Sequence, residues 1–142
     1  MHAPPPDDAH RPTPEPVVRE VRSWTLSTLD ELTGLRAAVR DDPLVRPLPA
    51  ETSDAVLLVT TELATNALRH GAPPAVVRVA LLDELLLVDV ADQDPGSRPV
   101  VAGTRAPGAG GFGLRLAYRL ATDVGWYRIG GSKHVWATFA RS

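Results

Sequence analysis

The stretch ELATNALRHG, residues 62–71, decides the fold of this chain. It closes the run DAVLLVTTELATNALRH, residues 54–70, which we expect to form a long helix. Signals for a helix start and a helix end flank the run, and Pro73 and Pro74 prevent its continuation. Thr52 or Ser53 is a candidate N-cap for this helix, and Gly71 stands where a left-handed C-cap residue is favoured.

Glu62 and Asn66 are four residues apart in the expected helix, so their side chains lie on one face. Ala55 and Val59 share that face. A carboxylate and an amide beside an apolar stripe are costly unless a metal, water or ligand satisfies them. The structural alternative is that Glu62 forms a salt bridge with an arginine and Asn66 caps a neighbouring loop.

Shorter elements precede and follow the long helix. Strands are expected over residues 17–25, 76–82, 85–91, 124–129 and 135–140, and further helices over residues 27–40 and 112–122. This order predicts an α+β fold, a two-layer α/β sandwich in which helices cover one face of a mostly antiparallel mixed sheet.

The composition indicates one domain with a polar tail. Six of the 14 prolines lie in residues 1–16, which we expect to be a disordered Pro-rich tail, and residues 17–142 form the domain. The chain of 142 residues has a net charge of −2 and no cysteine. Its charge gives no basic footprint for nucleic acid, and no apolar run reaches the ~20 residues of a membrane span. The lack of cysteine is compatible with the cytoplasm.

Asp92 follows the second strand of the first expected hairpin. Counting back by two, it shares a face with Val90, Val88 and Leu86. If that face is the core, Asp92 directs a carboxylate into a pocket at the end of the sheet. Alternatively, it initiates the turn over residues 93–96.

A glycine-rich segment, GAGGFGL over residues 108–114, leads into the helix expected from Phe112. Such a segment exposes backbone N–H groups beside a helix N-terminus, which suits a phosphate group. It is not the Walker pattern, because no Gly-Lys-Ser/Thr follows. A flexible linker is the structural alternative.

In order and spacing these motifs resemble those of the GHKL (Bergerat-type) ATPases, which have the histidine-kinase-like ATPase fold. The nearest branch is the RsbW-like anti-sigma factor serine kinases of the actinobacterial stand-alone type. ELATNALRHG resembles the N box, ADQDPG (residues 91–96) the first glycine box, and GGFGL (residues 110–114) the second. GGSKHVWATF (residues 130–139) resembles the closing hairpin, so the resemblance covers about residues 17–140.

The resemblance implies a role for each matching residue near the base and the metal. Glu62 would be the general base, and Asn66 would help to coordinate Mg²⁺ on the ATP phosphates. Asp92 would accept a hydrogen bond from the adenine amino group, and Gly96 would let the base approach.

The resemblance also implies a phosphate-binding region. Residues 97–110 would form an ATP lid in which Arg105 contacts phosphate. Gly111, Gly113 and Leu114 would hold the nucleotide at the start of the following helix.

Two positions depart from the family pattern. Asp94 replaces the first glycine of the first glycine box, and His134 stands where a threonine often supports the adenine contact. Ser132 or Thr138 would compensate for the missing threonine. Both departures concern nucleotide affinity rather than the fold.

The resemblance implies an ATP-binding regulator of transcription that phosphorylates a serine of a partner. Its partners would be a sigma factor, a STAS-type anti-anti-sigma protein, or both. A homodimer through the N-terminal strand and helix region is expected, with no direct contact to nucleic acid or membrane. The alternative is a non-catalytic module that sequesters a sigma factor with weak or no ATP turnover, which Asp94 and His134 favour slightly.

Overall fold

A computed structural model of the chain describes residues 11–93 and 112–142, although only the backbone of residues 112–114 is described. The elements are β1 (Arg19–Leu26), a 3-10 helix (Leu29–Glu31), α1 (Leu32–Asp41), α2 (Ala50–His70), β2 (Ala75–Leu82), β3 (Leu85–Asp92), α3 (Phe112–Leu120), β4 (Asp123–Ile129) and β5 (Ser132–Ala140). Their order is the one that the sequence predicted.

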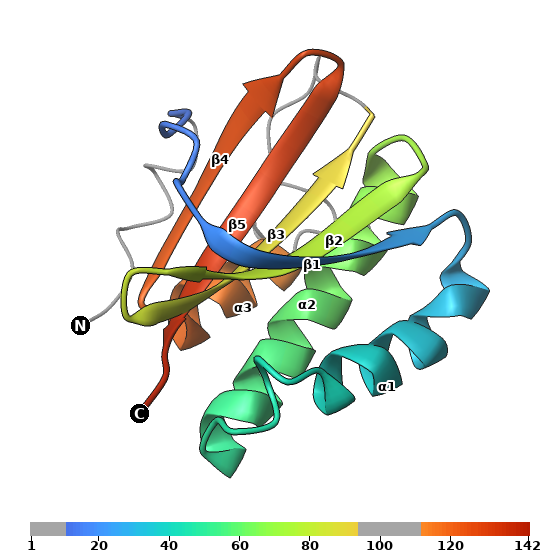
Figure 1. The fold of residues 1–142 in the computed structure, drawn as a ribbon. Helices are drawn as coiled ribbons and strands as arrows, with labels where there is room; N and C mark the ends of the chain where they lie inside the picture. Colours follow the sequence, from blue (N-terminus) through green and yellow to red (C-terminus); the bar gives the residue numbers. More distant parts are fainter. Residues whose placement is uncertain (1–10, 94–111) are drawn as a thin grey trace.

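The five strands form one sheet in the order β1-β2-β3-β5-β4, and the helices cover one of its faces (Figure 1). The two-layer α+β fold is therefore confirmed. The sequence left room for a mixed sheet, but every strand pair among the described residues is antiparallel.

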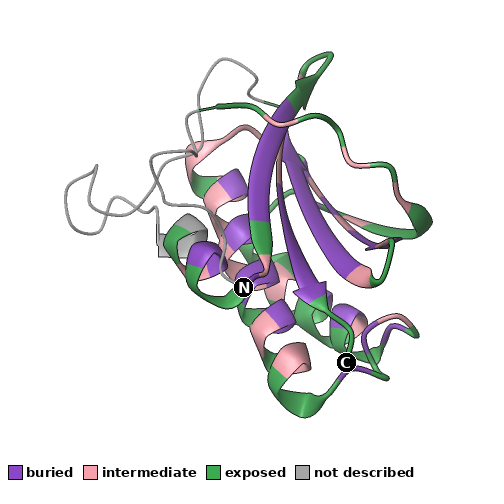
Figure 2. Ribbon diagram, turned by 90° about the vertical axis from the view of Figure 1, so that its left-hand side faces the viewer, coloured by how far each residue is buried: buried purple, intermediate pink, exposed green. Residues whose placement is uncertain are grey.

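The core lies between α2 and the sheet. Val56, Val59 and Leu63 follow one another at helical spacing on the buried side of α2, and each is at most 4% exposed. They pack against strand residues such as Val79 and Val88, both fully buried. Burial of each such side chain stabilises the fold by about 1.5–3 kcal/mol. Figure 2 shows this buried layer in purple along the strands and the inner side of the helices.

Both ends of α2 differ from the expectation. The helix begins at Ala50 with Pro49 as its N-cap residue, several residues before Thr52 and Ser53. Proline suits a helix start because its φ is fixed and it lacks a donor that would be unsatisfied there. The C-cap Gly71 has φ −99° and ψ −152°, so it is extended rather than left-handed.

The sheet face opposite the helices is partly covered by the N-terminal segment. The hydroxyl of Thr13 accepts a hydrogen bond of 2.9 Å from the indole of Trp136, and its backbone N–H donates to the carbonyl of Trp126 at 2.6 Å. A Cβ on Gly125 would lie 2.7 Å from the Thr13 methyl group, so the contact is close. The structure thus places Thr13 against the sheet, where composition alone predicted a disordered tail.

Candidate functional site

The structure places Glu62 beside α3, where it lines a cavity of about 510 Å³ together with Arg115, Leu116 and Arg119. Asn66 follows one turn later on α2. Both side chains are partly buried, and Val59 beneath Glu62 is fully buried. The face shared by Glu62, Asn66 and Val59 is therefore the one that the four-residue spacing predicted.

Neither structural alternative, a salt bridge of Glu62 or a loop cap by Asn66, is present among residues 11–93 and 112–142. Within those ranges Glu62 makes no salt bridge and Asn66 makes no side-chain hydrogen bond. Partly buried polar groups of this kind are usually hydrogen-bonded in folded proteins. A ligand in the cavity that Glu62 lines would be a partner for its carboxylate.

The sequence analysis did not identify Arg115 and Arg119 as site residues. They are four apart on α3, so both guanidinium groups lie on one side of the helix beside the cavity. Like charges at this spacing destabilise an isolated helix by about 0.2–0.5 kcal/mol. An anion between them would remove that repulsion, and guanidinium geometry suits phosphate. The sequence signal that could have identified them is their four-residue spacing directly after the glycine-rich segment.

Asp92 is buried at the end of β3, with 4% of its surface exposed. It lies on the helix-covered face with Val90, Val88 and Leu86, as predicted. The N–H of Gln93 donates to the carbonyl of Ala72 at 2.9 Å and joins this strand end to the segment after α2. The carboxylate is thus held between α2 and the sheet.

Lys133 is the cross-strand neighbour of Asp92, and its Nζ lies 3.6 Å from an Asp92 carboxylate oxygen. Lys133 is 6% exposed, so this is a buried ion pair. The sequence analysis missed this residue because the register between β3 and β5 is set by a long-range pairing. No local pattern indicated that Lys133 stands beside Asp92.

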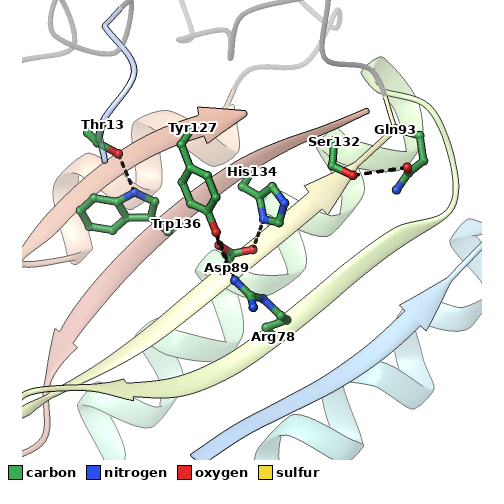
Figure 3. A network of polar contacts seen from close by, with 8 residues as sticks. All are labelled: Thr13, Arg78, Asp89, Gln93, Tyr127, Ser132, His134 and Trp136. Carbon is green, nitrogen blue, oxygen red and sulfur yellow. Dashed lines mark hydrogen bonds and ion pairs between the residues drawn. The ribbon is translucent and has the colours of Figure 1, made fainter. Parts of the chain in front are cut away.

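His134 lies on the opposite face of the sheet from Asp92, so it does not stand beside the carboxylate that is expected to bind the base. Its ring nitrogen Nδ1 lies 2.8 Å from Asp89, on the sheet face opposite the helices (Figure 3). The His134 ring stacks on Tyr127, with centroids 4.5 Å apart. Because side chains alternate across a strand, one step in register moves a residue to the other face.

Asp89 is the centre of this second polar cluster. It accepts a hydrogen bond of 2.5 Å from the Tyr127 hydroxyl, and Arg78 lies 3.2 Å from the same carboxylate oxygen. Burial alone would raise the pKa of Asp89, but hydrogen bonding and charge from His134, with Tyr127 and Arg78, outweigh burial and lower it. Burial first, and then the bond to Asp89, raises the pKa of Tyr127. The cluster is a structural ion-pair network of the outer face.

Several expected site residues lie outside the described residues. These are Asp94, Gly96, Arg105, Gly111 and the whole of the expected lid. Gly113 and Leu114 belong to the first turn of α3, as predicted, but only their backbone is described.

The described residues contain no group of three or more His, Cys, Asp or Glu side chains that could enclose a metal ion. Mg²⁺ keeps several waters and usually binds through one or two protein oxygens together with substrate phosphates. Asn66 does not line the cavity itself but lies one turn along α2 from Glu62, and its amide oxygen is a ligand of the type that Mg²⁺ uses in that mode. The site therefore suits a metal ion that arrives with a nucleotide.

Fold and site together define the class of histidine-kinase-like ATPase domains. The chain belongs to the histidine kinase-like ATPase domain family, whose profile matches residues 13–139. A search of curated proteins gave no match. In the described part of the chain, no helix has the length and apolar character needed to cross a bilayer.

One solved structure with a similar fold is that of the RsbU and RsbW domains of Rv1364c from Mycobacterium tuberculosis. It shares 19% identity and a TM-score of 0.63 with this chain. The match covers 84% of this chain and 31% of that one, so this chain spans about a third of the other's length. The likeness is one of fold.

Proposed function

We propose that this protein is an ATP-binding regulator of the anti-sigma factor type that phosphorylates a serine of an anti-anti-sigma partner. The observation that carries the proposal is the cavity at which Glu62 from α2 faces Arg115 and Arg119 from α3. It combines a carboxylate that can take a proton with two cations that can hold phosphate. Membership of the ATPase family supports ATP as the ligand.

In this proposal the arginines and the start of α3 bind the phosphates, and Asn66 presents its amide oxygen to the metal. Mg²⁺, when bound, neutralises charge on the phosphate oxygens. Glu62 accepts the proton of the incoming serine hydroxyl while the serine oxygen forms a bond to the γ-phosphorus. The bond from that phosphorus to the bridging oxygen breaks, and ADP leaves. Positioning and charge neutralisation supply most of the catalysis in such reactions.

Asp92 would bind the base end of the nucleotide. Its buried carboxylate is an acceptor and can take a hydrogen bond from the 6-amino group of adenine. It lies at the end of β3, on the sheet face that packs against the helices, so it stands at the edge of the layer between sheet and helices. We also propose, from the family resemblance, that the partners are a sigma factor and a STAS-type protein, and that the chain acts as a cytoplasmic homodimer.

A non-catalytic module that sequesters a sigma factor is the second candidate. Asp94 favours it, because a carboxylate replaces glycine in the first glycine box and adds negative charge beside a triphosphate. His134 no longer supports this candidate, since it lies on the opposite face of the sheet.

Phosphoryl transfer from γ-labelled ATP to a purified STAS-type partner separates the two candidates. The wild-type chain should label the partner, and Glu62→Gln should lower the rate by about 10²–10⁴-fold, the usual share of a general base. Glu51→Gln is the matched control, because Glu51 is exposed on the first turn of the same helix. Equal labelling by wild type and Glu62→Gln would remove Glu62 from the reaction. ATP binding without labelling of any partner would favour the sequestering module.

A further inference from the structure

We infer that the Asp92–Lys133 pair lets the base site accept 6-oxopurine nucleotides, such as GTP, as well as 6-aminopurine nucleotides. The inference rests on the proposed nucleotide site and concerns its base specificity. Lys133 is then a residue that determines base specificity. Its role follows from the acceptor of Asp92 and the donors of Lys133.

The pair presents an acceptor and a donor side by side. Asp92 and Lys133 face each other across β3 and β5, and the carboxylate and ammonium are 3.6 Å apart. Both belong to the helix-covered side of the sheet, where Val90 and Val135 are their neighbours two residues along each strand. A carboxylate only accepts hydrogen bonds, whereas an ammonium has three donors.

The 6-position distinguishes the two purines. Adenine carries an amino donor there, and guanine carries an oxygen acceptor. A carboxylate alone would bind the amino group of adenine and repel O6 of guanine, because the carboxylate and O6 are both hydrogen-bond acceptors. With the ammonium beside it, the 6-oxo group meets a donor, and lysine donation to O6 and N7 is a common way of reading guanine.

The surroundings hold the pair in place. A Cβ at Gly71 would lie only 2.4 Å from the Asp92 carboxylate, so the backbone at the end of α2 already packs closely against it. The Gln93–Ala72 hydrogen bond joins the same two segments. A fixed carboxylate also fixes the ammonium, since leaving a buried charge without its partner costs several kcal/mol in general. The base therefore meets a preset donor and acceptor.

Dissociation constants of MgATP and MgGTP, measured by calorimetry for the full chain, test the inference. Wild type should bind the two nucleotides within about tenfold of each other. Lys133→Met keeps the apolar length and removes the donor, so it should weaken GTP relative to ATP by about 10- to 100-fold, the equivalent of 1.5–3 kcal/mol for a hydrogen bond to a charged group. Arg69→Met is the control, because Arg69 is an exposed cation in the last turn of α2.

The outcomes separate this inference from the proposed function. Tight ATP binding with GTP more than 100-fold weaker in wild type would overturn the inference and leave the ATP site standing. An unchanged ATP-to-GTP ratio in Lys133→Met would also overturn it. Binding of neither nucleotide would contradict both.

The wild-type comparison of MgATP with MgGTP also covers the case in which Lys133→Met fails to fold, because it needs no variant. Similar dissociation constants for the two nucleotides in wild type support the inference, and a GTP dissociation constant more than 100-fold higher than that of ATP overturns it.

Discussion

The carboxylate of Asp92 packs against the backbone of Gly71, so closely that a Cβ at Gly71 would lie 2.4 Å from both its Cγ and one of its oxygens. The residue that closes the helix motif thus positions the residue expected to bind the base. Glycine is required at position 71 by this close approach, since its φ of −99° is open to any residue. The motif ELATNALRHG therefore contributes to both ends of the candidate nucleotide site.

Gly71→Ala should destabilise the protein by about 1–3 kcal/mol, the usual cost of overpacking a close contact. It should also weaken nucleotide binding, because the Asp92 carboxylate must move. Chemical denaturation and a nucleotide titration measure the two effects. Gly34→Ala is the control, since nothing lies within 4 Å of the added Cβ in α1 and alanine should stabilise that helix by about 0.5–1 kcal/mol. Equal stability of the two variants would contradict the close packing.

Arg119→Gln should weaken ATP binding by about tenfold and should weaken binding of adenosine little, because the guanidinium would contact phosphate rather than the base. Arg36→Gln, an exposed arginine on α1, should leave both affinities unchanged. Titrations at two salt concentrations measure this effect. A similar loss for adenosine would argue against a phosphate contact at α3.

Asn66→Ala should reduce the difference between ATP affinities measured with Mg²⁺ and with a chelator. The amide oxygen would be a metal ligand, so its loss removes the metal-dependent part of binding and leaves the metal-free part nearly unchanged. Wild type should bind ATP more weakly once Mg²⁺ is removed. If the variant keeps the full Mg²⁺ dependence, Asn66 does not hold the metal.

Acid should destabilise the protein through Asp89. Its folded-state pKa is lowered, so the unfolded chain binds this proton more readily than the folded chain. The stabilisation is fully present above the unfolded pKa of about 3.9 and is lost as the pH falls through the lower folded value. Asp89→Asn should flatten this part of the stability curve, and the exposed Asp54→Asn should not. Denaturation midpoints between pH 7 and pH 2 measure the slopes.

Asp89→Asn should also lower stability at neutral pH by about 3–5 kcal/mol. It leaves the partly buried Arg78 and the buried Tyr127 without their carboxylate partner, and losing one partner of such a pair is costly in a low-dielectric interior. An Asp89→Asn protein as stable as wild type at pH 7 would contradict the network.

Local patterns predicted most of the fold. The helix expected over residues 54–70 is α2, and the expected strands 76–82 and 85–91, only two residues apart, form the hairpin of β2 and β3. The start of α2 was misjudged because Pro49 begins the helix earlier than the hydroxyl residues that were expected to cap it. The positions of this helix and this hairpin depend on residues that are neighbours in the sequence, so the sequence alone can predict them.

The pairings that complete the site could not be read in this way. The β3–β5 register joins strands separated by α3 and β4, so no short turn fixes it. A shift of one residue there decides whether Lys133 or His134 stands beside Asp92. The packing of α3 against α2, which brings Arg115 to the cavity of Glu62, is likewise a tertiary contact.

The most direct test of the central claim is thermal unfolding of the wild-type chain at increasing MgATP concentration. A ligand that binds only the folded state raises the melting temperature with concentration, by the equivalent of about 2.7 kcal/mol at a hundredfold excess over its dissociation constant. The proposed ATP site predicts this rise, and the rise should shrink in Asp92→Asn and Arg119→Gln. A melting temperature that stays constant up to millimolar MgATP would contradict the claim that this protein binds ATP.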